Sequence, residues 1–448
     1  MSLQTNGPLF ENTFTTPETR EVFGTKGFVD RFVRVEAALA IAEASVGMVP
    51  ENAASTLAER ASAEHVDMEA VERYLEQRGL LSMAIIEGWR ENLGDEGRFV
   101  HWGSTSQDVI DTTVILQVRD ALDVLLERLR TIERRLADHV EAHADTPMIG
   151  RTHHVHAIPT TFGLKAASWL EELGRQIDQL SRVRKDLSVC QFGGAIGTYA
   201  TFGEDGPAIV DAFAAELGLE APTIGWHAAR DRIVRLIAAL ASVAGTLARA
   251  AKQVLLLGRP EVGELGDPVP EGEVGSSAMP HKRNPKRAET VVVLARLLRG
   301  EAQSMFSLMN TADERSASTW YGEFSVVPNA FGYADRCAET AHRLVDGLVV
   351  NPERMRANIS IHGALVTSEN VMMALADHVG RNMAHEIVYE SAMGANSSEA
   401  FVDRLLHDDR VMQSLTPQEV ASLTDPMSYT GLAERLARRT IEEHPRVG

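Results

Sequence analysis

The sequence predicts an all-α protein with a central bundle of long helices. Apolar residues recur at steps of three and four from Val118 to Val140 (Val118, Leu122, Leu125, Leu129, Ile132, Leu136 and Val140), which is the stripe of a very long amphipathic helix. A second stripe follows the same steps through Ala166, Leu170, Leu173, Ile177 and Leu180. Strand signals are sparse, and the chain shows no Rossmann fingerprint, P-loop or repeat of fixed period.

Helix breakers divide the chain into three predicted helical domains. Residues 1–100 include an amphipathic helix over 29–46, which begins after Gly27, and a stretch rich in Glu and Ala that predicts shorter helices. Residues 101–350 carry the long apolar stripes. Residues 351–448 hold shorter segments that are broken by Gly363, Gly394, Pro417 and Pro426, so they predict a small helical domain.

The segment 233–257 consists almost entirely of Ala, Leu, Val and Ile. Its charged residues Arg235, Arg249 and Lys252 favour a buried helix over a membrane span. A helix that is apolar on nearly every side needs neighbours all round, which we expect to exceed what one chain provides. The segment therefore predicts a bundle that forms the core of a homotetramer.

Composition narrows the class of partner. The chain has 448 residues, of which 44% are hydrophobic, and its net charge is −19. This acidity argues against nucleic acid and anionic membranes, because both bind basic surfaces. The two cysteines, Cys190 and Cys337, support no disulfide framework, and the N-terminus shows no signal peptide, so we expect a cytoplasmic protein. An anionic substrate would need a local basic site.

Residues 275–285 read GSSAMPHKRNP and supply such a site. Gly275 and the prolines predict a loop, and the cations Lys282 and Arg283 suit a ligand that bears carboxylates. The run resembles the GSSxMPxKxNP signature of the fumarase/aspartase superfamily. The resemblance implies that Ser276 removes a proton alpha to a carboxylate and that Lys282 and Asn284 hold that carboxylate. It also places Ser277, Met279 and Arg283 among the substrate-binding residues.

A second matching segment precedes the first long stripe. Residues 101–108 read HWGSTSQD, and their hydroxyls and Asp108 are typical helix-capping groups. The segment also resembles the TSxDxxxT element of the superfamily. This implies that Thr105 and Ser106 donate hydrogen bonds to a substrate carboxylate at a helix N-terminus, whereas Asp108 is structural.

Residues 150–161 read GRTHHVHAIPTT and contain three histidines. No Cys or HExxH motif accompanies them, so we predict no metal site. The segment resembles the superfamily's GRTHxQxAxPTT element, which implies a substrate contact for Thr152 and a general acid at His153. Val155 replaces the usual glutamine. His156 stands where cycloisomerase-like members carry a histidine, so either His153 or His156 can be the acid.

Two further segments match patterns of the superfamily. The segment that contains His227 resembles WHxxRDR, a pattern of the 3-carboxy-cis,cis-muconate cycloisomerases and of the related adenylosuccinate lyases. The segment that contains Arg315 resembles ERSxxxWxxEF, which is similar to the cycloisomerase branch. The implied substrate-binding residues include His227 and Arg315. A structural role for His227 at a helix entry stays open. The phosphate-binding elements of the related adenylosuccinate lyases have no counterpart here.

The resemblance implies a cycloisomerase of aromatic-compound degradation, which closes a lactone or reverses that step by beta-elimination on a dicarboxylate or tricarboxylate. The intermediate would be an aci-carboxylate carbanion, and no cofactor would be needed. One alternative is a fumarate-releasing lyase that cleaves a C–N or C–O bond, and another is a non-catalytic helical scaffold. The superfamily also implies a homotetramer whose active sites each draw on three chains.

Overall fold

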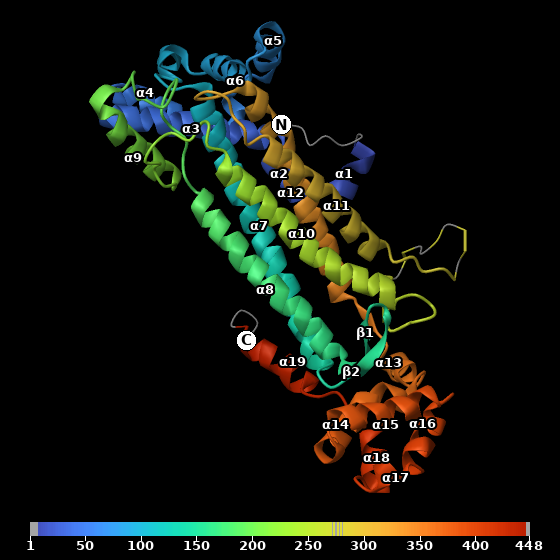
Figure 1. Cartoon of the computed structure of the whole chain (residues 1–448). Coiled ribbons are helices and arrows are strands. Elements are labelled where there is room, and N and C mark those ends of the chain that lie inside the picture. Colours follow the sequence, from blue (N-terminus) through green and yellow to red (C-terminus); the bar gives the residue numbers. More distant parts are fainter. Residues whose placement is uncertain (1–7, 271, 274–275, 277, 280, 445–448) are drawn as a thin grey trace. The chain divides into compact units, whose positions relative to one another are not determined.

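A computed structural model describes residues 8–270, 272–273, 276, 278–279 and 281–444 and confirms the all-α fold with a long-helix bundle (Figure 1). The first helices are α1 (Pro8–Phe14), α2 (Pro17–Phe23), α3 (Thr25–Ser45), α4 (Glu51–Glu59), α5 (Met68–Arg78) and α6 (Leu81–Arg90). The long helices are α7 (Ser106–Ala142), α8 (Phe162–Leu187), α10 (Asp231–Leu257), α11 (Lys286–Ser307) and α12 (Ala317–Asp346), with the shorter α9 (Gly206–Leu217) between α8 and α10.

The C-terminal helices are α13 (Pro352–Ile359), α14 (Ser368–Val379), α15 (Arg381–Met393), α16 (Ser398–Leu406), α17 (Asp409–Met412), α18 (Pro417–Leu423) and α19 (Ala433–Glu442). The described residues include four short strands, β1 (Pro147–Thr152), β2 (Val155–Thr161), β3 (Leu265–Gly266) and β4 (Val349–Val350). These strands form two antiparallel pairs, β1 with β2 and β3 with β4. Four short 3₁₀ turns complete the described elements.

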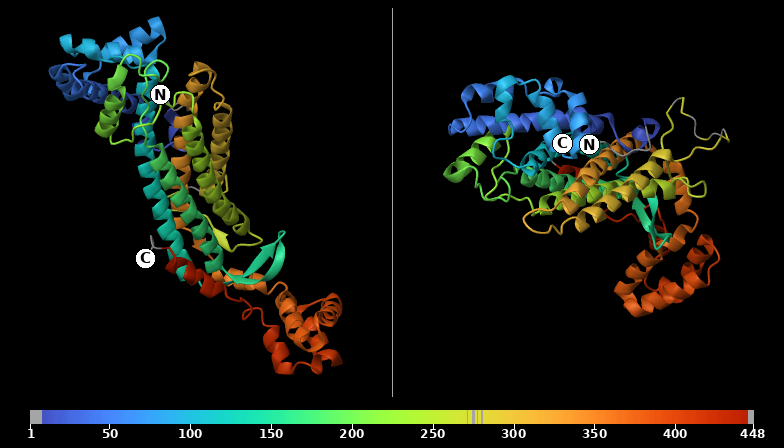
Figure 2. Two further views of the ribbon diagram at one scale, coloured as in Figure 1. Left: turned by 60° about the vertical axis from the view of Figure 1, so that its left-hand side comes forward. Right: turned by 90° about the horizontal axis from the view of Figure 1, so that it is seen from above.

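The chain folds into two compact units. Unit 1 consists of Met1–Leu129, Gln176–Leu247 and Val291–Glu339, and unit 2 consists of Arg130–Arg175, Ala248–Thr290 and Thr340–Gly448. Helices α7, α8, α10, α11 and α12 each give one part to either unit, and within a unit these parts run side by side (Figures 1 and 2). The division into domains at 1–100, 101–350 and 351–448 stays a prediction.

The apolar stripes form the core of the long helices. Every stripe residue predicted between Val118 and Val140 is at most 3% exposed, and every one between Ala166 and Leu180 is at most 1% exposed. Side chains three and four positions apart share one helix face, so each stripe gives one continuous buried surface. The two helix predictions are therefore confirmed.

Helix α10 is largely covered within one chain. Its exposed positions are the polar residues Arg235, Ser242, Arg249 and Lys252. These positions recur on one face, so the helix has a narrow polar stripe, and the expectation that a second chain covers part of it stays a prediction. Among the described helices, α10 is the one long and apolar enough to cross a membrane, but 61% of that window is buried, as in a core helix.

The hairpin of β1 and β2 is a feature that the helical periodicity did not predict. Its register pairs Pro147 with Thr161 and Thr152 with Val155, with an irregularity between Ile149 and Arg151. The two strands leave the end of α7 and return into α8 (Figure 2). The segment 150–161 therefore forms a hairpin before the second long helix, where sequence patterns showed only the helix that follows.

The last helices pack around their own apolar cluster within unit 2. Its fully buried members include Val371, Leu375, Ile387, Phe401 and Leu405 on α14, α15 and α16. Helices α14 and α15 lie against each other, and α16 contacts α15, α17 and α18. This cluster agrees with the prediction of short helices after Pro352.

Unit 1 contains a buried network of charges on Arg230, just before α10. Its guanidinium donates to both oxygens of Glu323 (2.8 and 2.6 Å) and to both oxygens of Asp111 (2.7 and 3.1 Å). All three side chains are at most 5% exposed, and Arg230 also lies over the ring of Trp226. One cation thus joins α7 to α12 by pairing with two buried carboxylates.

Substitution Arg230→Met should lower the free energy of unfolding by about 3–5 kcal/mol, because two buried carboxylates lose their cation. Urea denaturation followed by circular dichroism measures this change. The control is Arg235→Met, since the exposed Arg235 pairs with Asp231 and an exposed pair contributes about 0–1 kcal/mol. A loss for Arg230→Met as small as that of the control would contradict the role given to the network.

Candidate active site

The segment before α7 is held in a tight turn. His101 and Gly103 both have left-handed backbone angles, with φ of 63° and 69°. A Cβ at Gly103 would lie 2.7 Å from the ring of Phe202, so both the backbone angle and the space require glycine here. The turn delivers Thr105 and Ser106 to the N-terminus of α7, as the sequence predicted.

The carboxylate of Asp108 organises this turn. One oxygen accepts hydrogen bonds from the backbone N–H groups of Thr105 (3.1 Å) and Gly194 (2.9 Å). The other accepts from the side chains of His227 (2.8 Å) and Gln191 (3.2 Å). Asp108 is 1% exposed and His227 is 4% exposed, so the pair is buried. This geometry agrees with the structural role expected of Asp108. It also shows that His227 helps to hold the same turn through Asp108.

Unit 1 brings three of the predicted substrate-binding residues together. Arg315 donates a hydrogen bond to the hydroxyl of Thr105, and Ser82 of α6 donates to the hydroxyl of Ser106 (2.6 Å). Arg315 is exposed and Ser106 is half-buried. The group therefore offers two hydroxyls and a guanidinium, which are donors suited to a carboxylate.

A buried carboxylate on α3 supports the same turn. Glu36 accepts hydrogen bonds from the backbone N–H (3.1 Å) and ring Nδ1 (2.7 Å) of His101. Glu43 lies two turns further along α3, and its Oε1 is buried without a hydrogen-bond partner among the described residues. Burial, with a smaller effect from the charge of Glu36, raises the pKa of Glu43 to about 9.

The signature loop, residues 275–285, belongs to unit 2. The Oγ of Ser276 accepts hydrogen bonds from the backbone N–H groups of Met279 (3.2 Å) and Ala278 (3.4 Å). The predicted binding residue Ser277 lies outside the described residues, as does Gly275. Met279 is 44% exposed. Two backbone dipoles thus point at the hydroxyl that the sequence nominates as the base.

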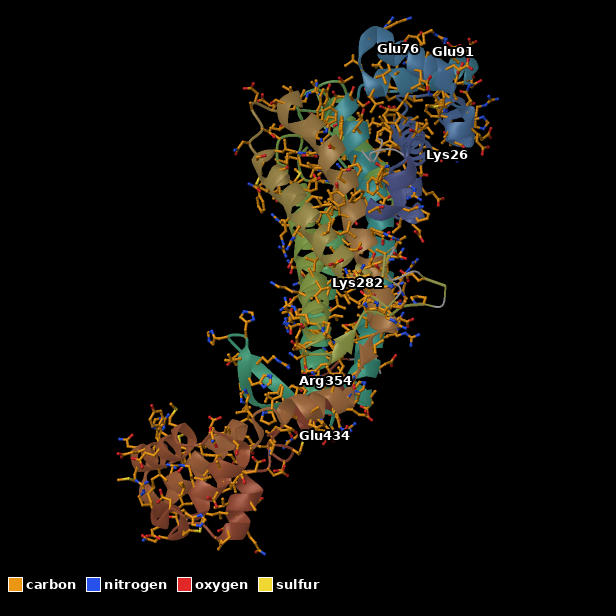
Figure 3. All side chains as sticks on the ribbon, turned by 90° about the vertical axis from the view of Figure 1, so that its right-hand side faces the viewer. Lys26, Glu76, Glu91, Lys282, Arg354 and Glu434 are labelled. Carbon is orange, nitrogen blue, oxygen red and sulfur yellow. The ribbon has the colours of Figure 1, made fainter. Side chains whose placement is uncertain are left out.

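The far end of the loop lines a cavity of about 620 Å³ in unit 2, which we name the loop cavity. Lys282, Arg283 and Asn284 contribute to its wall together with Arg259; Figure 3 shows Lys282 on the segment before α11. Arg287 of α11 anchors the loop by donating to Glu273 (2.6 Å) and to the carbonyl of Pro268 (2.7 Å). The loop cavity therefore groups three of the predicted binding residues.

The β1–β2 turn carries His153 and His154, both with positive φ (49° and 69°). This is the backbone of a type I′ turn, for which Asn and Gly are the usual residues, so two histidines here are held at some conformational cost. Thr152 and Val155 close the turn and are exposed. The strained tip presents both rings away from the core.

His153 and His156 lie in different surroundings. His153 lines a cavity of about 340 Å³ beside the turn, whereas His156 lines another of about 320 Å³ and packs edge-on against His362. The Nδ1 of His156 is buried without a described hydrogen-bond partner, and burial, followed by the charge of Arg151, lowers the pKa of His156. The two candidate acids therefore do not share a cavity in unit 2.

A family model described as "Lyase" matches residues 11–300. The chain belongs to this lyase family. A second family model, described as "Adenylosuccinate lyase C-terminus", matches residues 364–440. Together with the relatives below, these matches confirm the predicted membership of the fumarase/aspartase superfamily.

The lyase is similar to two kinds of characterised enzyme. It is 36% identical to the N-acetyl-S-(2-succino)cysteine lyase of Dickeya dadantii, over 97% of this chain and 96% of the relative. It is also 36% identical to the 3-carboxy-cis,cis-muconate cycloisomerase of Pseudomonas aeruginosa, over 98% and 97%. The crystal structure of the 3-carboxy-cis,cis-muconate lactonizing enzyme of Pseudomonas putida matches with a TM-score of 0.90 at 34% identity, over 98% and 100%. The chain is therefore an enzyme of the lyase or cycloisomerase kind.

The support around Asp108 includes residues that the sequence analysis did not assign to the site. Gln191 donates to Asp108, and its Oε1 accepts the backbone N–H of Trp226 (2.6 Å). Glu36 is separated from His101 by 65 positions along the chain. Such partners have no local sequence signal, because they are brought together by the packing of distant segments.

Substitution Glu43→Gln should stabilise the lyase at alkaline pH. The pKa of Glu43 is about 9 in the folded chain against an ordinary value of 4.5, so the folded chain keeps a proton that the unfolded chain releases. The free energy of unfolding of the wild type therefore falls as the pH rises between these values, by about 1.4 kcal/mol per pH unit from this residue. Glutamine cannot ionise, so the difference between variant and wild type should grow with pH.

Urea denaturation of both proteins at pH values from about 4 to about 9 measures this difference. The matched control is Glu51→Gln, which changes an exposed glutamate at the start of α4. A difference between Glu43→Gln and wild type that stays constant across the range would show that Glu43 is ionised in the folded chain.

Proposed function

We propose that this lyase removes a proton alpha to a carboxylate and eliminates the group beta to it, or catalyses the reverse addition, on a small polycarboxylate. The observation that carries the proposal is the pair of backbone N–H groups on the Oγ of Ser276. A serine hydroxyl is a weak base unless its alkoxide is stabilised, and hydrogen bonds to the charged form provide that stabilisation. Lys282, six residues further along the loop, adds a positive charge.

The intermediate of this reaction concentrates two negative charges on one carboxyl group. Lys282 and Asn284 of the signature loop supply a cation and an amide donor for it. Thr105, Ser106 and Arg315 supply hydroxyls and a guanidinium at the start of α7. His153 would return a proton to the leaving group, with His156 as the other candidate. No step requires a cofactor, and we place the enzyme in the cytoplasm.

Our first candidate reaction is cycloisomerisation of 3-carboxy-cis,cis-muconate. In this reaction a carboxylate oxygen adds to a double bond, which closes a lactone, and the carbanion that results takes up a proton. The support is the similarity to cycloisomerases over nearly the whole chain, both in sequence and in fold.

A second candidate is elimination of a thiol from a succinyl thioether. The equal similarity to the N-acetyl-S-(2-succino)cysteine lyase favours it. In this reaction the bond from carbon to sulfur breaks, the proton on the adjacent carbon passes to the base, and fumarate and a thiol leave. Sulfur joins the C–N and C–O leaving groups that the sequence analysis considered.

A substrate panel tests the proposal. The wild type is incubated with 3-carboxy-cis,cis-muconate, N-acetyl-S-(2-succino)cysteine, adenylosuccinate and other substituted succinates, while ultraviolet absorbance and thiol release are followed. We expect turnover of the first or second compound and none of adenylosuccinate. Ser276→Ala should remain folded and lose about 10²- to 10⁴-fold in kcat, because a general base is removed.

Near-normal turnover by a folded Ser276→Ala variant would show that Ser276 is not the base. Release of AMP from adenylosuccinate would contradict the argument that the phosphate-binding elements are missing. The exposed Ser304→Ala on α11 is a matched control, since it removes a hydroxyl outside the loop.

We further propose that the enzyme is a homotetramer whose sites each combine segments from three chains. The superfamily resemblance supports this assembly, and the exposed tip of the hairpin suits a role in a neighbouring chain's site. Two inactive variants, Ser276→Ala and His153→Ala, should then regain part of the activity when they are dissociated and reassembled together, because some mixed sites contain no substituted residue.

Native mass spectrometry verifies that mixed tetramers have formed. Mixed tetramers without activity would rule out either the shared site or the role of His153. The parallel mixture of His156→Ala with Ser276→Ala identifies which histidine acts.

A further inference from the structure

The cavity beside the β1–β2 turn has a basic wall in an acidic protein. We name it the hairpin cavity; it measures about 340 Å³ and is lined by Arg151, His153, His154, Lys165 and Arg259, with apolar residues from the end of α10. The net charge of the chain is −19, so this local group of cations opposes the overall charge. A concave basic surface of this kind concentrates small anions.

One of these cations is already neutralised. Arg151 donates to both oxygens of Glu264 (2.9 and 2.7 Å), which is completely buried. Asn358 donates to the same carboxylate (2.7 Å). The carboxylate of Glu264 is therefore engaged by Arg151 and Asn358, and among the described residues it makes no hydrogen bond or ion pair with the other cations of the cavity.

Lys165 and Arg259 are two cations of the hairpin cavity that have no described partner. Within the described part of the chain, neither side chain has a hydrogen bond or ion pair. Lys165 stands in the first turn of α8, which contains no acidic residue, and the positive end of a helix disfavours a cation there. Burial, followed by the charge of Arg151, lowers the pKa of Lys165. The charge of a lysine in this position lowers the stability of the protein without a ligand. A bound anion would stabilise that charge.

Arg259 connects the hairpin cavity to the loop cavity. It is part of the wall that contains Lys282 and Asn284 as well as of the wall that contains Lys165 and His153. Both cavities belong to unit 2, so this relation is internal to one unit. One guanidinium can thus face an anion in either cavity, and a guanidinium binds a carboxylate through two parallel hydrogen bonds.

We propose that the hairpin cavity is a binding site for a small dicarboxylate, in which Lys165 and Arg259 bind the carboxylates. Two positive charges match the charge of such a dianion, and the side chains of Leu256, Leu257 and Val262 offer apolar contact to its carbon chain. The proposal rests on the proposed function for the class of ligand. It adds two binding residues that the sequence signatures do not contain.

Binding of succinate to the full-length protein tests the site, because succinate is a dianion without a leaving group. Isothermal titration calorimetry compares wild type with Lys165→Met and Arg259→Gln. We expect each substitution to weaken binding by about ten- to a hundredfold, the usual effect of a lost charged hydrogen bond. The matched control Lys252→Met removes an exposed lysine of α10 next to the cavity residue Gln253, and it should stay within about twofold of wild type.

Lys282→Met distinguishes the two cavities, since Lys282 lines the loop cavity and does not line the hairpin cavity. Succinate binding that survives Lys282→Met and is lost in Lys165→Met supports the proposal. Binding that is lost in Lys282→Met and unchanged in Lys165→Met overturns it. If the methionine protein does not fold, Arg259→Gln is the informative variant: unchanged succinate binding in a folded Arg259→Gln variant overturns the proposal.

The test of the binding site can fail or succeed independently of the test of the proposed function. If Lys165→Met loses succinate binding while the wild type turns over no member of the substrate panel, the dicarboxylate site stands and the proposed function fails. If the wild type turns over a substrate while Lys165→Met binds succinate normally, the proposed function stands and this site fails.

Discussion

The buried carboxylate of Asp108 is the contact on which the first group of site residues depends. It joins the turn before α7, the loop at Gly194 and the segment at His227, which come from three distant parts of the sequence. A carboxylate that accepts four hydrogen bonds holds its charge at low cost, because donors replace the water that it has lost. Thr105 is positioned by its backbone through this contact, which leaves its hydroxyl for other partners.

Unit 2 also contains a buried carboxylate that accepts hydrogen bonds from distant segments. Glu264 is buried and shared by Arg151 and Asn358, and this fixes the first strand of the hairpin to the end of α13 and to the segment before β3. Each unit therefore has a buried carboxylate whose charge is satisfied by hydrogen-bond donors. Near it, each unit has further donors closer to the surface that can bind an anion. A rigid interior charge and an adaptable exposed one together make a site that is precise in position and open to different anions.

Much of the fold could be predicted because it follows from local periodicity. The stripes from Val118 to Val140 and from Ala166 to Leu180 define buried helix faces, and the structure has them. The hairpin was missed since its strands are short and Pro159 lies within one of them, which removes a ladder donor and weakens the strand pattern. The expectation that a second chain covers part of α10 stays a prediction, because hydrophobic composition says how much of a helix must be covered and not which chain covers it.

The candidate site shows the same limit. Signature motifs located Thr105, Ser276 and Lys282, whereas Gln191, Glu36 and Arg259 come from segments whose contribution depends on tertiary packing. At the hairpin tip, His153 and His154 take left-handed angles and are exposed. Asparagine and glycine would adopt that backbone at lower cost, so folding does not require histidine at either position. The tip is therefore free to diverge, and a descendant of this enzyme could acquire a new leaving group by changing the tip residues while the helical bundle beneath stays the same.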